Sequence, residues 1–159
     1  DCSTYTEACE ALHQTLEPFR SSCKLIVGMD ANVQLVPSCS PTVGTVTSGF
    51  SPPGLRERCV IALAEALGLR FQNTWTSRQN DFMTHRAWNG RREAQIDFLV
   101  MSQTLNSGVC YSIPTACASD HKAICCEVPV DRPPAAAAPT AASARGTRAL
   151  RCRAGASRR

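Results

Sequence analysis

The stretch Leu25-Ile26-Val27-Gly28-Met29-Asp30-Ala31-Asn32 places two side chains of catalytic type directly after a short apolar run. Leu25–Val27 predicts a buried strand, because the run is short, apolar and partly β-branched. Gly28 is expected to let the chain turn sharply where that strand ends. Residues at alternate positions leaving a strand point the same way, so Asp30 and Asn32 are predicted to converge on one ligand. The same pattern also fits an ordinary turn, since Asp and Asn both favour turns.

Further motifs downstream favour the catalytic interpretation of this stretch. In chain order they are Thr74-Trp75 with Phe82-Met83-Thr84, then Gln95-Ile96-Asp97-Phe98-Leu99-Val100, then Ser119-Asp120-His121. Together with Gly28-x-Asp30-x-Asn32, their order over Lys24–Val130 resembles the C-terminal half of the endonuclease/exonuclease/phosphatase superfamily, closest to the endonuclease domains of non-LTR retrotransposons. The resemblance implies an α+β fold, the C-terminal half of a four-layered α/β-sandwich of the deoxyribonuclease-like kind.

The resemblance implies a metal-dependent phosphodiesterase, endonuclease-like, with DNA as its partner and Mg²⁺ (or Mn²⁺) as its cofactor. By this resemblance Asp30 orients and deprotonates the attacking water, and Asn32 helps to hold the phosphate. His121 donates a hydrogen bond or positive charge to the phosphoryl oxygen. Asp97 accepts from the other ring nitrogen of His121. Asp120 is implied as the metal ligand, since hard cations prefer carboxylate oxygens.

One of these assignments also has a reason in the residues themselves. Asp97 lies within the apolar run Ile96–Val100, and a lone carboxylate inside such a strand is costly without a partner. His121 is the partner that we expect, at about 2.6–3.2 Å between heavy atoms.

Two further residues are expected on the substrate side of the site. Thr84 matches the family's Thr on the strand before Asp97, which implies a polar support close to the substrate. Arg86 is placed beside the substrate, although a solvated charge on a hairpin is the default interpretation for an arginine there.

The chain of 159 residues is expected to comprise a globular domain over 1–130 and a tail over 131–159. The tail is rich in Pro, Ala and Arg with almost no large apolar residue, which predicts disorder. It holds seven arginines against Asp131, a net charge of +6, whereas the whole chain carries +4. The domain therefore carries −2, so a basic footprint for nucleic acid is absent from it.

The cysteines and the chain ends suggest an intracellular protein, nuclear or cytoplasmic. None of the 10 cysteines forms a Cys-x-x-Cys pair, so most are expected to be reduced, small, buried residues. No apolar run approaches the roughly 20 residues of a membrane span. The chain begins at Asp1 without an initiator Met or leader, and we expect a fragment or a processed piece.

Apolar spacing predicts two helices. The first has its apolar face on Tyr5 to Phe19, is capped by Ser3 or Thr4 and ends near Pro18. The second is Leu55–Leu67, which Gly68 stops.

The rest of the domain is predicted to consist of loops and strands. The segment 37–53 is rich in Ser, Thr, Gly and Pro and is predicted to be a long surface loop. A hairpin with a tight primed turn is predicted at Asn89-Gly90. The predicted strands are 70–75, 82–88, 94–101, 109–113 and 123–130.

The family's N-terminal half carries an Asn and a metal-ligating Glu, and neither motif is visible in this sequence. The remainder of the domain is therefore expected in a longer chain, and Mg²⁺ is expected to bind weakly here. Two other functions stay open. One is a catalytically inactive retroelement remnant or interaction module. The other is a small-molecule phosphatase of the same superfamily.

Overall fold

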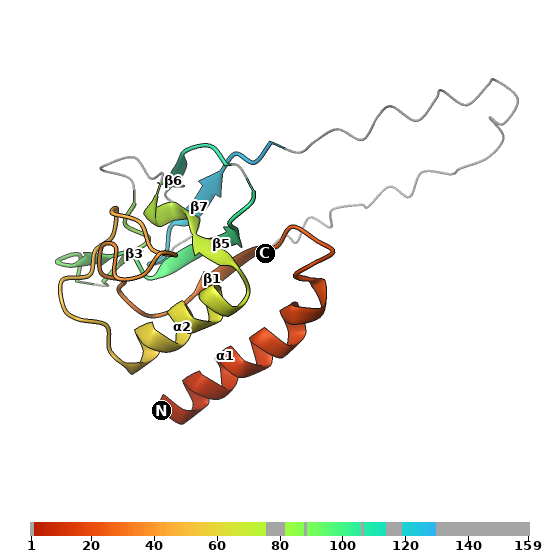
Figure 1. The fold of residues 1–159 in the computed structure, drawn as a ribbon. Helices are drawn as coiled ribbons and strands as arrows, with labels where there is room; N and C mark the ends of the chain where they lie inside the picture. Colours follow the sequence, from red (N-terminus) through yellow and green to blue (C-terminus); the bar gives the residue numbers. More distant parts are fainter. Residues whose placement is uncertain (1, 76–81, 88, 106, 114–118, 130–159) are drawn as a thin grey trace, which may run out of the picture. The chain divides into compact units, whose positions relative to one another are not determined.

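A computed structural model of the chain describes residues 2–75, 82–87, 89–105, 107–113 and 119–129. These residues combine helices with antiparallel sheets, which places the fold in the α+β class (Figure 1). The tail predicted at 131–159 lies outside the described residues, as do Trp88 and Val130 at the ends of two predicted strands.

The main sheet has three strands, with β5 (Asp97–Ser102) in the centre. β1 (Ile26–Asp30) pairs antiparallel with one edge of β5, and β2 (Leu69–Phe71) pairs antiparallel with the other. The register places Ile26 opposite Met101 and Asp30 opposite Asp97. The prediction that the runs Leu25–Val27 and Ile96–Val100 form neighbouring strands of one sheet is confirmed.

Helices α1 (Cys2–Leu16) and α2 (Leu55–Ala66) lie side by side on one face of this sheet (Figure 1). Gly68 ends α2 as predicted, because its φ of 63° is a conformation that glycine adopts without strain. The core lies between helices and sheet. Its buried members from α2 and the strands are Val60, Ile61, Leu63, Ala64, Leu69, Phe71, Phe98 and Val100.

β1 is only half covered, which corrects the prediction of a fully buried strand at Leu25–Val27. Val27 and Met29 pack toward the core, whereas Ile26 is 51% exposed and Gly28 is open to solvent. Side chains of a strand alternate between its two faces, and the helices cover only one face. Gly28 also lies within the strand, because pairing with β5 continues to Asp30; the left-handed residue is Asn32, with φ 49°.

The first helix differs from its prediction at both ends. It already includes Cys2, so Ser3 lies in the first turn and donates a hydrogen bond to Glu7 at 2.9 Å instead of capping the helix. The α-helix ends at Leu16 and continues as a 3₁₀ turn, η1 (Glu17–Phe19), in which Phe19 is half exposed.

The segment 37–53 is only in part the surface loop that its composition predicts, because Pro37, Ser38 and Phe50 are exposed whereas other residues of the segment are buried. Val43, Gly44, Ser48 and Gly49 are buried. A Cβ on Gly44 would lie 2.2 Å from the Thr74 carbonyl oxygen, so the backbone approaches more closely than other residues allow. Hydrogen bonds to neighbouring segments, such as Val46 N–H to Thr74 O at 2.9 Å, satisfy its backbone groups. A segment whose polar backbone groups are paired can be buried at little cost.

The strand predicted at 70–75 stops early. β2 ends at Phe71 and is followed by a 3₁₀ turn, η2 (Gln72–Thr74). Within this turn the side chain of Asn73, 2% exposed, takes over the pairing with β5. Its Nδ2 donates to Asp97 O at 3.1 Å, and its Oδ1 accepts from Leu99 N–H at 3.1 Å. A side-chain amide offers the same donor and acceptor as a backbone peptide, so the turn replaces a strand without losing β5's hydrogen bonds.

Two short ribbons complete the described fold. β3 (His85–Arg86) pairs with β4 (Glu93–Ala94), and β6 (Cys110–Ile113) pairs with β7 (Ala123–Cys126), both antiparallel. The first ribbon is the predicted hairpin, but its turn is not primed. Gly90 N–H donates to Ala87 O at 2.7 Å, and of the pair Asn89-Gly90 only Gly90 has a positive φ.

The strand predicted at 94–101 is divided between β4 and β5. The N–H groups of Gln95 and Ile96 donate to the side chains of Ser48 and Thr84 instead of to a neighbouring strand. The predicted continuous strand is therefore interrupted by two residues whose backbone is held by side chains.

The described cysteines are less buried than predicted. Cys9, Cys39, Cys59, Cys125 and Cys126 are half-buried free thiols and Cys23 is exposed, whereas Cys110 is buried. Across the part of the chain that the structure describes, no helix combines the length and apolar character needed to cross a membrane.

Candidate functional site

Two carboxylates face each other at one end of the main sheet. Asp30 on β1 and Asp97 on β5 are register partners, on the face of the sheet away from the helices. Like charges directly opposite in an antiparallel pair destabilise the sheet unless a cation compensates them. His121 supplies that compensation, since its ring and the two carboxylates offer ligand atoms that all lie within 4.8 Å of one another.

The predicted pairing of Asp97 with His121 is present. His121 Nδ1 lies 3.0 Å from Asp97 Oδ2 and 3.1 Å from Oδ1, within the predicted range. An ionised carboxylate only accepts, so Nδ1 carries the proton. This hydrogen bond is the main cause that raises the pKa of His121 above the ordinary value of 6.5; desolvation opposes it, and the charges of Asp97, Asp30 and Asp120 add to it.

The loop that carries His121 is held beside β3 like an additional short strand. His85 and His121 form an isolated antiparallel bridge. On either side of it, Arg86 N–H donates to Asp120 O at 2.8 Å, and Lys122 N–H donates to Thr84 O at 2.6 Å. The pairing fixes the backbone of the Ser119-Asp120-His121 motif, so the side chain of His121 reaches Asp97 from a defined position.

Buried polar side chains hold the backbone of Asp97. Thr84 Oγ1 accepts the N–H groups of Ile96 and Asp97 at 3.1 and 3.0 Å, and Asn73 donates to the carbonyl of Asp97. Thr84 is 1% exposed, so its position favours the supporting role over contact with a substrate. Arg86 is exposed on β3 beside this support.

Asn32 and the carboxylate pair line different hollows. Asp30 lines a shallow hollow of about 290 Å³ together with Asp97, Leu99 and Lys122, whereas Asn32 lines a different hollow beside Phe50. The predicted convergence assumed a strand that continues through Asn32. The left-handed backbone of Asn32, with φ 49°, ends the alternation of side chains between the two faces of the strand. Its N–H donates to Asp30 Oδ1 at 3.2 Å, as in a turn.

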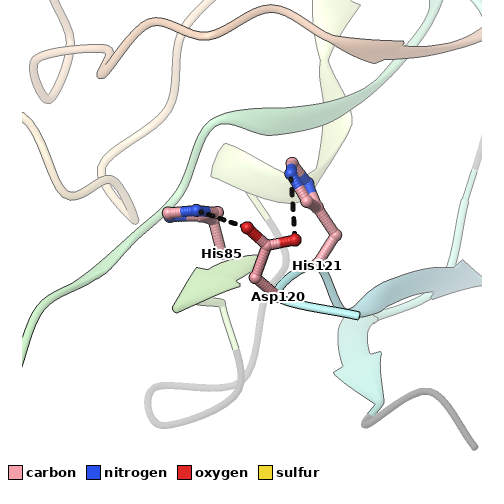
Figure 2. A group of neighbouring side chains, drawn as sticks. All are labelled: His85, Asp120 and His121. Atoms are coloured by element: carbon pink, nitrogen blue, oxygen red, sulfur yellow. Dashed lines mark ion pairs between the residues drawn. The ribbon is translucent and has the colours of Figure 1, made fainter. Parts of the chain in front are cut away.

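Asp120 lies between two histidines (Figure 2). Its Oδ2 is 3.5 Å from His85 Nε2, and its Oδ1 is 4.0 Å from His121 Nε2. The imidazole rings of His85 and His121 meet edge to face, with centroids 5.1 Å apart. Sequence reasoning assigned no role to His85, and only the pairing of β3 with the loop at His121 brings it here.

Comparisons of this chain with protein-family models, with curated proteins and with solved structures find no match. The resemblance to the endonuclease/exonuclease/phosphatase superfamily therefore rests on the ordered motifs.

Proposed function

We propose that this chain carries the C-terminal half of a metal-dependent phosphodiesterase, an endonuclease-like domain of the deoxyribonuclease-like sandwich kind that hydrolyses phosphodiester bonds in DNA. The observation that carries the proposal is the cluster of Asp30, Asp97 and His121, which three separate segments bring to one end of the sheet.

Each side chain of the cluster has a different role in the proposed phosphodiester hydrolysis. Asp97 holds the proton on His121 Nδ1, so Nε2 is the ring atom directed toward Asp120 and outward. The raised pKa of His121 favours the charged imidazolium, and a charged N–H donor stabilises negative charge developing on a phosphoryl oxygen. Asp30 is an exposed carboxylate beside them and is the group suited to take the proton of an attacking water.

The cofactor follows from the carboxylates. Mg²⁺ is commonly bound through one or two carboxylates, with water and substrate phosphate as its other ligands. Asp120, with 56% of its side chain exposed, fits as such a ligand. Once bound, Mg²⁺ compensates the charge of the phosphoryl oxygens.

The uncovered face of β1 supports the half-domain part of the proposal. Ile26 and Gly28 stand open on the same face as Asp30. The exposed side chain of Ile26 is one that the second sheet of a sandwich would cover.

The test is nicking of supercoiled plasmid DNA by the purified chain in Mg²⁺. We expect Mg²⁺-dependent nicking that His121→Ala slows by about 10²–10³-fold, the usual cost of removing one transition-state donor. His13→Ala is the matched control, because His13 lies on α1 beside Glu17, away from the cluster. Equal rates in both variants would contradict the proposed role of the cluster, and no nicking by the unmodified chain would favour the catalytically inactive remnant. Hydrolysis of phosphomonoesters alone would favour a small-molecule phosphatase.

A further inference from the structure

The three side chains drawn in Figure 2 suggest a second kind of cation site. We propose that His85, Asp120 and His121 bind a divalent transition metal of the Zn²⁺ type, and that the bound metal blocks the catalytic use of His121. The blocking part rests on the proposed function, whereas the binding part stands on the geometry of the three residues.

The donor atoms select the metal. Two imidazole nitrogens and one carboxylate are a usual ligand set for Zn²⁺ and other late transition metals. Mg²⁺ prefers oxygen ligands in near-octahedral geometry and gains little from imidazoles. The cluster therefore distinguishes Zn²⁺ from the Mg²⁺ of the proposed reaction.

The spacing is close to that of a formed site. Asp120 Oδ2 lies 3.5 Å from His85 Nε2, and Asp120 Oδ1 lies 4.0 Å from His121 Nε2. One ligand atom from each of the three residues lies within 4.8 Å of the other two. Zn–N and Zn–O bonds of about 2.0–2.2 Å put the ligand atoms of a tetrahedral site about 3.3–3.5 Å apart. The half-exposed side chain of Asp120 can make the small movement that is required, while the bridge between His85 and His121 holds the backbone.

Asp97 prepares His121 as a metal ligand. Metal-binding histidines typically donate their other ring N–H to a carboxylate, which fixes the tautomer and raises ligand basicity. Asp97 accepts from Nδ1 at 3.0 Å, and Nε2 is the ring nitrogen on the side of Asp120. Three protein ligands also leave a fourth position for water, as in Zn²⁺ sites that stay open.

Occupation of this site removes the proposed catalytic donor. A metal ion on Nε2 replaces the N–H that would contact the phosphoryl oxygen, and it engages the carboxylate assigned to Mg²⁺. Zn²⁺ is therefore expected to inhibit the Mg²⁺-dependent reaction, and inhibition should weaken when His85 is replaced.

The direct test is a ZnCl₂ titration of the full chain, followed by NMR of the histidine rings. The chain has 3 histidines, so each ring can be assigned. We expect the resonances of His85 and His121 to shift together and saturate at one Zn²⁺ per chain, while those of His13 stay fixed. His85→Ala should weaken binding at least tenfold, His85→Gln should do so without removing the side chain's bulk, and His13→Ala should have no effect.

Cysteine thiolates are the competing ligands, since the chain has 10 cysteines. Titration with Co²⁺ separates the two sets, because thiolate ligands add an intense charge-transfer absorption that imidazole and carboxylate ligands lack. Binding that shows this absorption, or ring resonances of His85 and His121 that do not move, would overturn the inference. Both measurements need no substrate, so they stand even if the chain fails to nick DNA; conversely, nicking without Zn²⁺ binding would remove only this inference.

Discussion

At the scale of single residues, the site depends on the electrostatic interactions among the side chains of Asp30, Asp97 and His121. Asp30 and Asp97 repel each other across the β1–β5 pair, and Asp97 is the more buried of the two. A protonated His121 offsets both the repulsion between the two carboxylates and the cost of burying Asp97, because it pairs with Asp97 at 3.0 Å and lies near Asp30. The arrangement that offsets the repulsion between the two carboxylates therefore also favours the charged imidazolium of His121.

Replacing Asp97 by Asn should lower the pKa of His121, because the hydrogen bond from Nδ1 to the carboxylate is the largest contribution that raises it. The pKa is measured by NMR titration of the metal-free chain. Asp120→Asn is the matched control and should lower the pKa less, since Asp120 is 4.0 Å from the ring and largely exposed. An unchanged His121 pKa in Asp97→Asn would refute the pairing.

The pairing also predicts how stability depends on pH. The folded-state pKa of His121 is raised above 6.5, so its contribution to stability is fully present below about pH 6.5. That contribution is lost as pH rises through the folded-state pKa. The free energy of unfolding of the unmodified chain should therefore fall over this window, and denaturant unfolding of Asp97→Asn should show a flatter profile. Parallel pH profiles of the two proteins would contradict this linkage.

At the scale of elements, Asn73 joins the η2 turn to the central strand. Asn73→Ala leaves Leu99 N–H and Asp97 C=O without the amide that pairs with them, and unsatisfied buried groups cost about 1–3 kcal/mol. Urea unfolding measures this loss. Gln103→Ala is the matched control, because Gln103 also donates an amide hydrogen bond to a backbone carbonyl, that of Leu69, but from an exposed position. Equal losses in the two variants would show that burial does not set the cost.

The buried part of the segment 37–53 depends on close backbone contact at Gly44. Gly44→Ala should destabilise the fold by about 1–3 kcal/mol or more, because the added Cβ would lie 2.2 Å from the Thr74 carbonyl oxygen, and backbone atoms cannot easily move away. Gly28→Ala is the control, since a Cβ there meets nothing within 4 Å and glycine is a poor strand residue. Thermal unfolding should separate the two variants, and a neutral Gly44→Ala would refute the close contact.

At the scale of the whole molecule, the side-chain groups that could hold a cation have ligand atoms better suited to transition metals than to Mg²⁺. Among the described residues, each group of three possible ligands includes at least one histidine. We therefore expect calorimetric titration of the isolated chain with Mg²⁺ to show no tight stoichiometric site, because this ion requires near-octahedral oxygen ligation. The titration with Zn²⁺ is the internal control for a competent, folded sample. A tight one-to-one Mg²⁺ site would mean that further oxygen ligands lie in this chain.

Several features of this protein follow from local sequence pattern. The helices at α1 and α2 follow from apolar residues three and four positions apart, because a helix needs an apolar stripe against its core. The end of α2 follows from Gly68, since a left-handed residue is a local requirement. Even the contact between Asp97 and His121 was expected, because a carboxylate in an apolar strand needs a partner and the order of the motifs indicated His121.

Other features depend on contacts between distant segments, and sequence pattern predicted them wrongly or not at all. The segment 37–53 has the composition of a surface loop, yet residues 42–44 and 48–49 within it are buried, because backbone groups of Thr74 and other neighbours pair with those of the segment. Asn73 is of a residue type that is common in turns. Its side chain can pair with β5 only because the tertiary structure places the η2 turn beside that strand. His85 reaches Asp120 because β3 pairs with the loop at His121. The local sequence determines which residues prefer water and which prefer a given backbone angle. The hydrogen-bond partner of a buried polar group depends on which distant segments the tertiary structure brings together.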